Sequence, residues 1–422
     1  MTSSPFDWSR LLAASAGVAV PMLVFGRVAL AVAIVLAALC LFLLPNRAEH
    51  WRRPFEGLKS PLGVAILATF VLWLPNLFAS IDPLRSFEAS ARVFLIVGLL
   101  TALGSVLASD RRLLDICLKA LIIMTAVATV MAVLSLTVAP EIFWVTHLKG
   151  WRSDQPNNAV KPFAALTVLL IPVLLWAGHR FGARWLAVTG VSSIGLLVVV
   201  WLTYNRAAIA GMIAALIACG TLIAWAERRT SVTVIITAVV VATVAAVVVW
   251  LKMTRGIYCK IPWDGYIELE PYLPVWLIDY ERQLTWRFAL GLMREAPWIG
   301  LGINTINFQP GADAQIPHTL DLPMISGHPH NWIVEVLVET GVVGLIPLLV
   351  VIVTMFYQFA LGYTQNRDPA MLAATATAAG YWGSGLFNFS FWSVWWQTSF
   401  ILVLVICWAA GSEKRGGIPS GN

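Results

Sequence analysis

Charged residues are scarce in this sequence. Asp, Glu, Lys and Arg make up 12% of its 422 residues, whereas an ordinary soluble domain carries about 25%. The mean hydropathy is +0.80. These values exclude an ordinary soluble domain and predict a polytopic membrane protein. The formal charge of +6 comes from basic residues scattered between apolar runs, so we expect no nucleic-acid binding.

Cysteine pairs and the common phosphate and metal motifs are also missing. The five cysteines form no C-x-x-C pair, which argues against a disulfide framework or a thiolate metal site. No G-x-x-x-x-G-K-[ST], H-E-x-x-H or G-x-S-x-G motif supports ATP hydrolysis, zincin proteolysis or an esterase. The acidic pairs Glu268/Glu270 and Asp279/Glu281 are only a weak indication of a divalent cation. We expect no metal and no other cofactor.

What the sequence has instead is a series of apolar runs, about twelve of which are long enough for a helix to cross a bilayer. They cover approximately residues 8–26, 28–45, 61–79, 89–108, 113–138, 163–178, 185–203, 207–226, 231–251, 331–357, 370–390 and 393–410. The predicted fold is an all-α polytopic membrane protein with one long extracytoplasmic loop that carries short helices. Its parts are residues 1–251 (helices 1–9), 252–330 (the loop) and 331–422 (helices 10–12 and a tail).

The distribution of basic residues predicts the orientation. If the N-terminus is inside, the short inner connections hold roughly twice as many Lys and Arg residues as the outer ones, as the positive-inside rule requires. Both termini are then cytoplasmic, and the long loop is outside. The N-terminal apolar run has no cleavage site before the next one, so we interpret it as a retained span.

The long loop is predicted to contain an amphipathic helix, from Glu281 to Glu295. Leu284, Phe288 and Leu292 recur at intervals of four residues and therefore share one face. Pro297 and the following glycines end it. The twenty tryptophans fit aromatic belts at the membrane interfaces, although the close spacing of Trp392, Trp395 and Trp396 also suggests a groove.

Three cationic or titratable groups fall at the same outer membrane edge: Arg206, the pair Arg282 and Arg287, and the pair His328 and His330. Titratable groups at that depth are costly unless they are paired or used. Guanidinium groups bind phosphate oxygens and keep their charge at any physiological pH. The set therefore predicts a site for an anionic ligand with one end in lipid.

Simpler interpretations stay open for several of these residues. Arg206 equally fits a topological anchor at the interface, Arg287 the solvated face of the loop helix, and His328 an ordinary loop position beside Pro329. Downstream, Asn331, Glu335 and Glu339 follow at i, i+4 and i+8 and share one helix face. Glu335 is expected to orient or pair with a cation, while Glu339 equally fits helix packing.

These motifs together resemble the O-antigen ligase and O-antigen polymerase superfamily. The family's H-x-H-N and E-x-G-x-x-G motifs match His328 to Asn331 and Glu339 to Gly344. Its arginine after a span matches Asn205-Arg206-Ala207, with Asn in place of Ser. Its loop motif matches Arg282, Trp286 and Pro297 to Gly302, and its first outer loop matches Ser80-Ile81-Asp82-Pro83.

The resemblance implies an inner-membrane enzyme that acts at the periplasmic face. It implies transfer of a glycan from undecaprenyl diphosphate to a sugar hydroxyl of lipid A-core, without metal and with inversion. A polymerase or a protein O-oligosaccharyltransferase with the same donor is the alternative within the superfamily. Outside it, a transporter or flippase of a lipid-linked anion is the alternative.

The resemblance also implies roles for individual residues. Two arginines suit a diphosphate leaving group, and a neutral imidazole suits removal of the acceptor proton. The expected catalytic residues are His330, Arg206 and Arg282. The expected substrate-binding residues are Arg287, His328, Asn331, Glu335 and Trp286.

Overall fold

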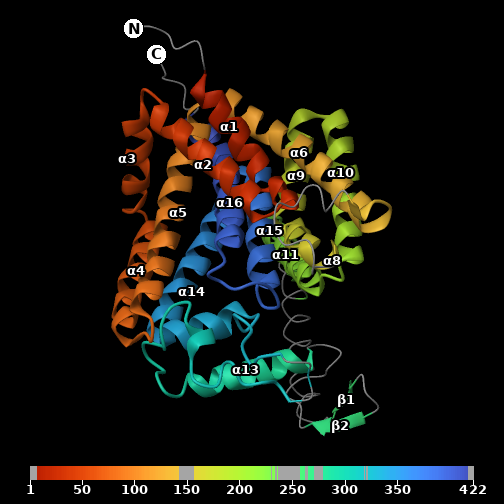
Figure 1. The fold of residues 1–422 in the computed structure, drawn as a ribbon. Helices are drawn as coiled ribbons and strands as arrows, with labels where there is room; N and C mark the ends of the chain where they lie inside the picture. The colour runs from red at the N-terminus through yellow and green to blue at the C-terminus, as the bar shows by residue number, and fades with distance from the viewer. Residues whose placement is uncertain are drawn as a thin grey trace, which may run out of the picture.

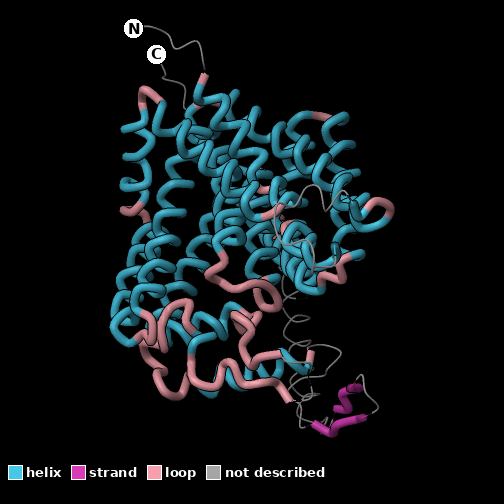
Figure 2. The backbone as a smooth tube through the Cα atoms, viewed as in Figure 1, coloured by secondary structure: helices cyan, strands magenta, loops and turns pink. Residues whose placement is uncertain are grey.

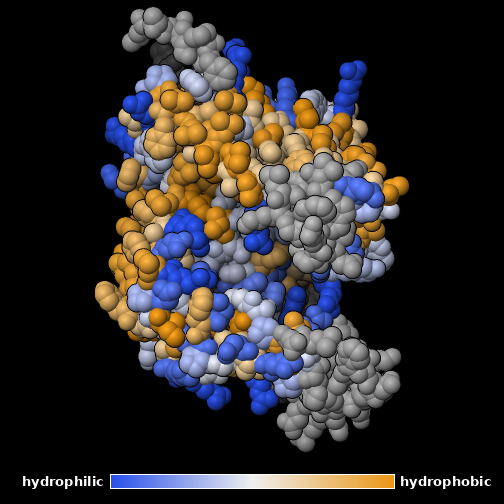
Figure 3. Space-filling model, viewed as in Figure 1, coloured by the Kyte–Doolittle hydropathy of each residue, from blue (hydrophilic) through white to orange (hydrophobic). Residues whose placement is uncertain are grey.

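The protein is a bundle of helices whose described chain begins and ends on the same side (Figure 1). The computed structural model describes residues 7–141, 156–229, 257–261, 265–269, 279–317 and 322–416, with residues 231, 232, 235 and 319. Helix α13 lies at the opposite end of the bundle, where most of the loop residues gather (Figure 2). Apolar side chains cover much of the visible face of the bundle, and polar ones collect at the α13 end (Figure 3).

The first half of the chain forms a run of helices. They are α1 (Trp8–Ala19), the 3-10 helix η1 (Pro21–Phe25), α2 (Arg27–Leu43), α3 (Arg47–Gly57), α4 (Pro61–Ala79), α5 (Pro83–Ser109), α6 (Arg111–Thr137), α8 (Pro156–Ala165), α9 (Thr167–Phe181), α10 (Ala183–Leu202) and α11 (Arg206–Ala226).

The second half begins with a small hairpin, in which β1 (Ile257–Ile261) pairs antiparallel with β2 (Gly265–Leu269). The helices that follow are α13 (Tyr280–Leu292), the 3-10 helix η2 (Ile306–Phe308), α14 (Trp332–Asn366), α15 (Pro369–Ser384) and α16 (Val394–Gly416). The amphipathic helix predicted between residues 281 and 295 is confirmed as α13.

Within the described residues, seven helices are long and apolar enough to cross a membrane: α4, α5, α6, α10, α11, α14 and α16. The number rises to nine if the bent pairs α2/α3 and α8/α9 each form one span. The predicted multi-pass helical class is therefore confirmed, whereas the count of about twelve remains a prediction. The ninth predicted span, residues 231–251, lies almost wholly outside the described residues.

The clustered tryptophans form neither a belt nor a groove. Trp392, Trp395 and Trp396 are 2%, 4% and 1% exposed. Trp396 packs against Tyr381 and Trp395, whereas Trp392 packs against Trp73 and Phe391 in a second core cluster. Burial of such large apolar surfaces is strongly favourable, so the close spacing of these residues reflects packing.

A break inside α14 determines how the α13 end is built. At Gly341, φ is 66° and ψ is −174°, a conformation almost restricted to glycine. Residues 332–340 therefore form a separate short helix before the long part of α14. This corrects the expectation of one continuous span from residue 331 to 357.

The loop of residues 297–302 supplies the hydrogen bonds that the break removes from the helix. Four backbone bonds of 3.0–3.1 Å join the two segments: Leu301 N to Val338 O, Gly302 N to Glu339 O, Val342 N to Pro297 O, and Val343 N to Trp298 O. We call residues 297–302 and residues 338–343 together the α14 junction. Because buried backbone groups need partners, each segment requires the other.

Helix α4 completes the α14 junction through Asn76, which is 1% exposed. Its Nδ2 donates to the carbonyls of Ile299 at 2.7 Å and Glu339 at 2.5 Å, and its Oδ1 accepts from Ile303 N at 2.9 Å. The first turn of α5 is also attached beside the α14 junction, because Ser86 donates to the Ile303 carbonyl at 2.9 Å. The two glycine-containing motifs, residues 297–302 and 339–344, and the turn from Ser80 to Pro83 therefore form one structural unit.

We predict that Gly341→Ala destabilises the protein. A Cβ at this position would lie 2.2 Å from the Trp298 carbonyl oxygen, and the positive φ strains any other residue. The free energy of unfolding, measured in nanodiscs, should fall by at least about 2 kcal/mol. Gly190→Ala in α10 is the control, because a Cβ there meets nothing within 4 Å. Equal losses in both variants would contradict the junction.

Candidate functional site

The two predicted catalytic arginines meet at the carboxylate of Asp279. Nη2 of Arg206, the first residue of α11, lies 2.8 Å from both carboxylate oxygens of Asp279. Nε of Arg282 lies 3.9 Å from Oδ2 of the same carboxylate. The Arg206 side chain is 60% exposed and that of Arg282 is 26% exposed. The cluster therefore opens to solvent on the Arg206 side.

The backbone presents His330 from a strained position. Its φ of 54° lies in the left-handed region, which is uncommon for residues other than glycine and marks many functional sites. The Nδ1 atom lies 3.2 Å from the carbonyl oxygen of Asn388. A carbonyl only accepts, so Nδ1 carries the proton and Nε2 keeps its lone pair. His330 can therefore accept a proton at Nε2.

The two imidazoles lie against each other, with ring centroids 4.1 Å apart. Burial, above all, lowers the pKa of His328 to about 3; His330, Arg282 and Arg27 act in the same direction, and a hydrogen bond to the Asn388 backbone opposes them. Burial also lowers the pKa of His330 to about 4; Arg282 adds to this effect, while the Asn388 carbonyl and Asp279 oppose it. Both rings are therefore neutral at physiological pH.

The charged residues of the cluster affect the pKa values of one another and of His330. The charges of Arg282 and Asp279 both act on His330, and the charge of Arg206 acts on Arg282, whose pKa is lowered mainly by burial. A charge affects the pKa of another group in this way only when the two groups lie close together in a partly buried site. The structure thus brings the three predicted catalytic residues into one cluster.

Trp286 holds α13 against the histidine segment. Its Nε1 donates to the Pro329 carbonyl at 2.6 Å, and its ring lies 6.4 Å from that of Phe387. Thr285, the preceding residue, donates to the Met324 carbonyl at 2.9 Å. These bonds connect both ends of the 324–329 segment to α13, and they give Trp286 a positioning role beside its predicted role in substrate binding.

Asn331 has a structural task as well. Its Oδ1 accepts hydrogen bonds from the backbone N–H groups of Ile333 and Val334 at 3.0 and 3.2 Å, and it thereby caps α14. This cap begins the short helix directly after His330. The asparagine of the H-x-H-N motif therefore fixes the helix start that follows the histidine.

Glu335 is hydrogen-bonded to the segment that follows Asn388, and its expected role in substrate binding stays a prediction. It is 1% exposed, and its carboxylate accepts hydrogen bonds from the Ser390 hydroxyl and from Phe391 N, the latter at 2.7 Å. Because both oxygens are used by the segment that follows Asn388, Glu335 positions that segment.

Glu339 is the second carboxylate of this helix face, and it is fully buried. It accepts from Asn304 N at 2.8 Å, from Ile306 N at 2.9 Å and from the Trp392 indole. It thus joins the residues after the α14 junction to the aromatic core. Of the two roles open for Glu339, the structure supports packing.

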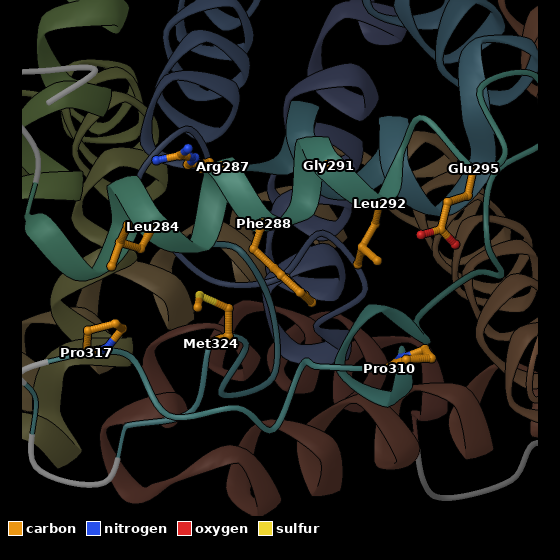
Figure 4. A pocket seen from close by; sticks show the side chains of 9 residues that line it. All are labelled: Leu284, Arg287, Phe288, Gly291, Leu292, Glu295, Pro310, Pro317 and Met324. Carbon is orange, nitrogen blue, oxygen red and sulfur yellow. The ribbon is translucent and has the colours of Figure 1, made fainter. Parts of the chain in front are cut away.

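Arg287 lines a cavity of about 570 Å³ between α13 and the residues Pro310, Pro317 and Met324. Leu284, Phe288 and Leu292 extend from α13 toward this cavity, whereas the Arg287 side chain points away from Phe288 (Figure 4). The apolar face predicted for α13 therefore lines this cavity.

Sequence reasoning missed three contributors to the site. The sequence presents Asp279 only as half of an acidic pair, Asn388 lies within a predicted apolar span, and Arg27 lies between two predicted spans. Arg27 lies over the Trp395 ring at 5.7 Å from its centroid. Only the fold brings residues so distant in sequence together, although the unusual polar residues Asn388 and Ser390 between apolar helices were a detectable signal.

Comparison with known proteins gives one family and several relatives. Residues 191–349 match the family model described as O-Antigen ligase. The "Putative polysaccharide ligase" of Rickettsia conorii is 26% identical over 144 residues, which are 32% of this chain and 33% of that protein. The protein of the same name from Rickettsia bellii is 26% identical over 132 residues, 30% of each chain. The chain thus spans about a third of the length of these relatives.

We predict that the buried imidazoles make the stability of the protein sensitive to acid. The pKa of His328 is about 3 when folded, against about 6.5 for an unfolded chain. The unfolded state therefore binds more protons below pH 6.5, and stability falls as the pH drops from 6.5 toward 4. His328→Gln should reduce this fall.

The measurement is the melting temperature in nanodiscs between pH 7.5 and 4.5. His179→Gln serves as the control, because His179 is an exposed histidine of α9. An unchanged acid dependence in His328→Gln would show that His328 is not held neutral by the fold.

Proposed function

We propose that this chain is a membrane glycosyltransferase that ligates a glycan from undecaprenyl diphosphate to a sugar hydroxyl of lipid A-core. The family match over residues 191–349 and the polysaccharide ligase relatives confirm the resemblance to the O-antigen ligase superfamily. The donor, the acceptor and the residue roles are part of our proposal. A polymerase or a protein O-oligosaccharyltransferase would use the same donor and would differ in the acceptor.

The observation that supports the proposal most is the meeting of Arg206 and Arg282 at the Asp279 carboxylate, with His330 near enough for Arg282 and Asp279 to affect its pKa. A diphosphate leaving group is a weak base, so its departure requires stabilisation of negative charge more than protonation. Two guanidinium groups provide this stabilisation, and they remain charged at any physiological pH. In our proposal they bind the phosphate oxygens.

His330 is the proposed general base. With Nδ1 donating to the Asn388 carbonyl, Nε2 is available to take the proton of the acceptor hydroxyl as that oxygen attacks the anomeric carbon. The C–O bond to the diphosphate breaks in the same step, and its electron pair leaves with the phosphate oxygen. A neutral imidazole is suited to this transfer.

The carboxylates of the described residues support direct attack and therefore inversion. Glu335 and Glu339 are buried and hydrogen-bonded, and Asp279 is paired with Arg206. Glu335 and Glu339 are therefore not available as the nucleophile that a covalent glycosyl intermediate would require, and Asp279 serves the arginines in our proposal.

The acceptor side is assigned to the cavity beneath α13, with Arg287 at its edge. Phe288, Leu284 and Met324 form an apolar lining, and Arg287 and Glu295 add charged groups at the rim. Sugar rings offer apolar faces to aromatic groups and hydroxyls to charged ones. His328 and Trp286, which adjoin His330, complete the proposed binding surface.

The proposed location is the bacterial inner membrane, with the site on the periplasmic side and both termini in the cytoplasm. Helix α1 begins and α16 ends at the bundle end opposite α13 (Figure 1). This arrangement supports the orientation that the basic residues predict.

The proposal predicts how three substitutions affect transfer by the purified protein. His330→Ala should lower kcat by about 10²-fold or more, because the proton acceptor is lost. Arg206→Lys and Arg282→Lys should each lower kcat by about tenfold to a hundredfold, because lysine keeps the charge but loses the paired donors. The assay measures glycan transfer from a lipid-linked donor to lipid A-core.

Arg294→Lys is the matched control, since Arg294 is an exposed arginine just after α13. Full activity of His330→Ala in folded protein would refute the assignment of the base. Accumulation of the lipid-linked glycan across vesicles without a covalent product would favour a flippase.

The pH profile gives a second test of the base. Since the pKa of His330 is about 4 in the protein without donor, kcat/KM for the donor should stay level from pH 8 to about 5.5 and fall as the pH approaches 4. The profile of kcat/KM reports the groups of the free enzyme. An acid limb centred near 6.5 would contradict a buried imidazole beside Arg282, Asp279 and His328.

A further inference from the structure

Asp279 stands at the N-cap position of α13, but its side chain does not cap the helix. At comparable positions, Asp82 and Asp110 accept hydrogen bonds from backbone N–H groups of α5 and α6, as N-cap aspartates commonly do. The carboxylate of Asp279 instead binds Arg206 with both oxygens at 2.8 Å. The first N–H groups of α13 thus lack the side-chain cap that its sequence provides.

The contact to Arg206 is the kind of contact a phosphate would make. A carboxylate offers two oxygens in the geometry that a guanidinium also uses for phosphate. Arg282 lies within 3.9 Å of the same carboxylate, and the positive charge of Arg206 disfavours the charged form of Arg282. Asp279 therefore neutralises two cations that repel each other.

A ligand with a diphosphate would meet these same groups. It carries more negative charge than Asp279, and Arg206 is 60% exposed and thus accessible to it. Asp279 is itself 38% exposed, so its side chain has room to rotate. Rotation back to the helix start would give it the backbone N–H groups of α13 as new partners.

We propose that Asp279 is an internal competitor of the lipid diphosphate. It holds Arg206 in the donor-free protein, moves to the N-cap of α13 when the diphosphate binds, and returns to Arg206 as the lipid diphosphate product leaves. The inference rests on the proposed function, because it takes the arginine cluster to be the diphosphate site. Asp279 is a positioning residue here, since it acts through Arg206.

A static role for Asp279 predicts the opposite effect on binding. If Asp279 only kept Arg206 in the orientation that binds the donor, its removal would release the arginine and weaken binding. If it competes, its removal leaves both arginines available and strengthens binding. The sign of the change in affinity therefore separates the two roles.

The experiment measures binding of a polyprenyl diphosphate without glycan to the full-length protein in nanodiscs. Asp279→Asn keeps the shape of the side chain and removes its charge. Because partly exposed ion pairs are weak, the dissociation constant should fall by about three- to fivefold. The same variant should show a similar fall in the inhibition constant of this product in the transfer assay. Glu88→Gln removes a carboxylate of α5 that pairs with Arg92; it is the control and should change neither.

Arg206→Ala separates failure of the inference from failure of the proposed function. If wild-type protein binds the polyprenyl diphosphate and Arg206→Ala weakens binding by at least about tenfold, the diphosphate site stands. Unchanged or weaker binding by folded Asp279→Asn then overturns the competitor role alone. If wild-type binding is absent or does not depend on Arg206, the diphosphate site itself is wrong, and the competitor role falls with it.

Discussion

The break of α14 at Gly341 is the constraint on which the rest of the α13 end depends. A helix that stops at this residue leaves backbone groups without partners, and the loop of residues 297–302 supplies them. The same loop places α13 on one side and the segment around Asn304 on the other. Because Asn331 starts the short helix that ends at the break, His330 is fixed at its beginning. The position of His330, the proposed base, thus depends on a glycine eleven residues further along the chain.

Charge and burial divide the site into two unlike parts. The arginine cluster is partly exposed and keeps its cations beside one carboxylate. The histidines lie half-buried next to it, and desolvation and the charge of Arg282 lower the pKa of His330 to about 4. A ligand with negative charge would instead raise the pKa of His330 and make it a stronger base. In the proposed reaction, the donor thereby strengthens the base that serves its own transfer.

Much of this arrangement could be predicted from the sequence, and the reasons are local. Apolar runs specify the helices, and the four-residue spacing of Leu284, Phe288 and Leu292 specifies α13. The sequence shows the motif glycines as a pattern but does not reveal their role. The hydrogen bonds at Gly341 join segments about forty residues apart, which only the fold brings together. Glu335 was assigned to substrate binding because it shares a helix face with Asn331. That face turned out to pack against Phe391, a contact that only the fold provides.

The central claim is that a diphosphate held by Arg206 and Arg282 is displaced directly by a hydroxyl that His330 deprotonates. The most direct test is the anomeric configuration of the bond that the purified protein forms from a lipid-linked glycan of known configuration, determined by NMR. The account predicts a glycan linked to lipid A-core with the opposite configuration. Retention of configuration would require a covalent glycosyl intermediate and would contradict the account.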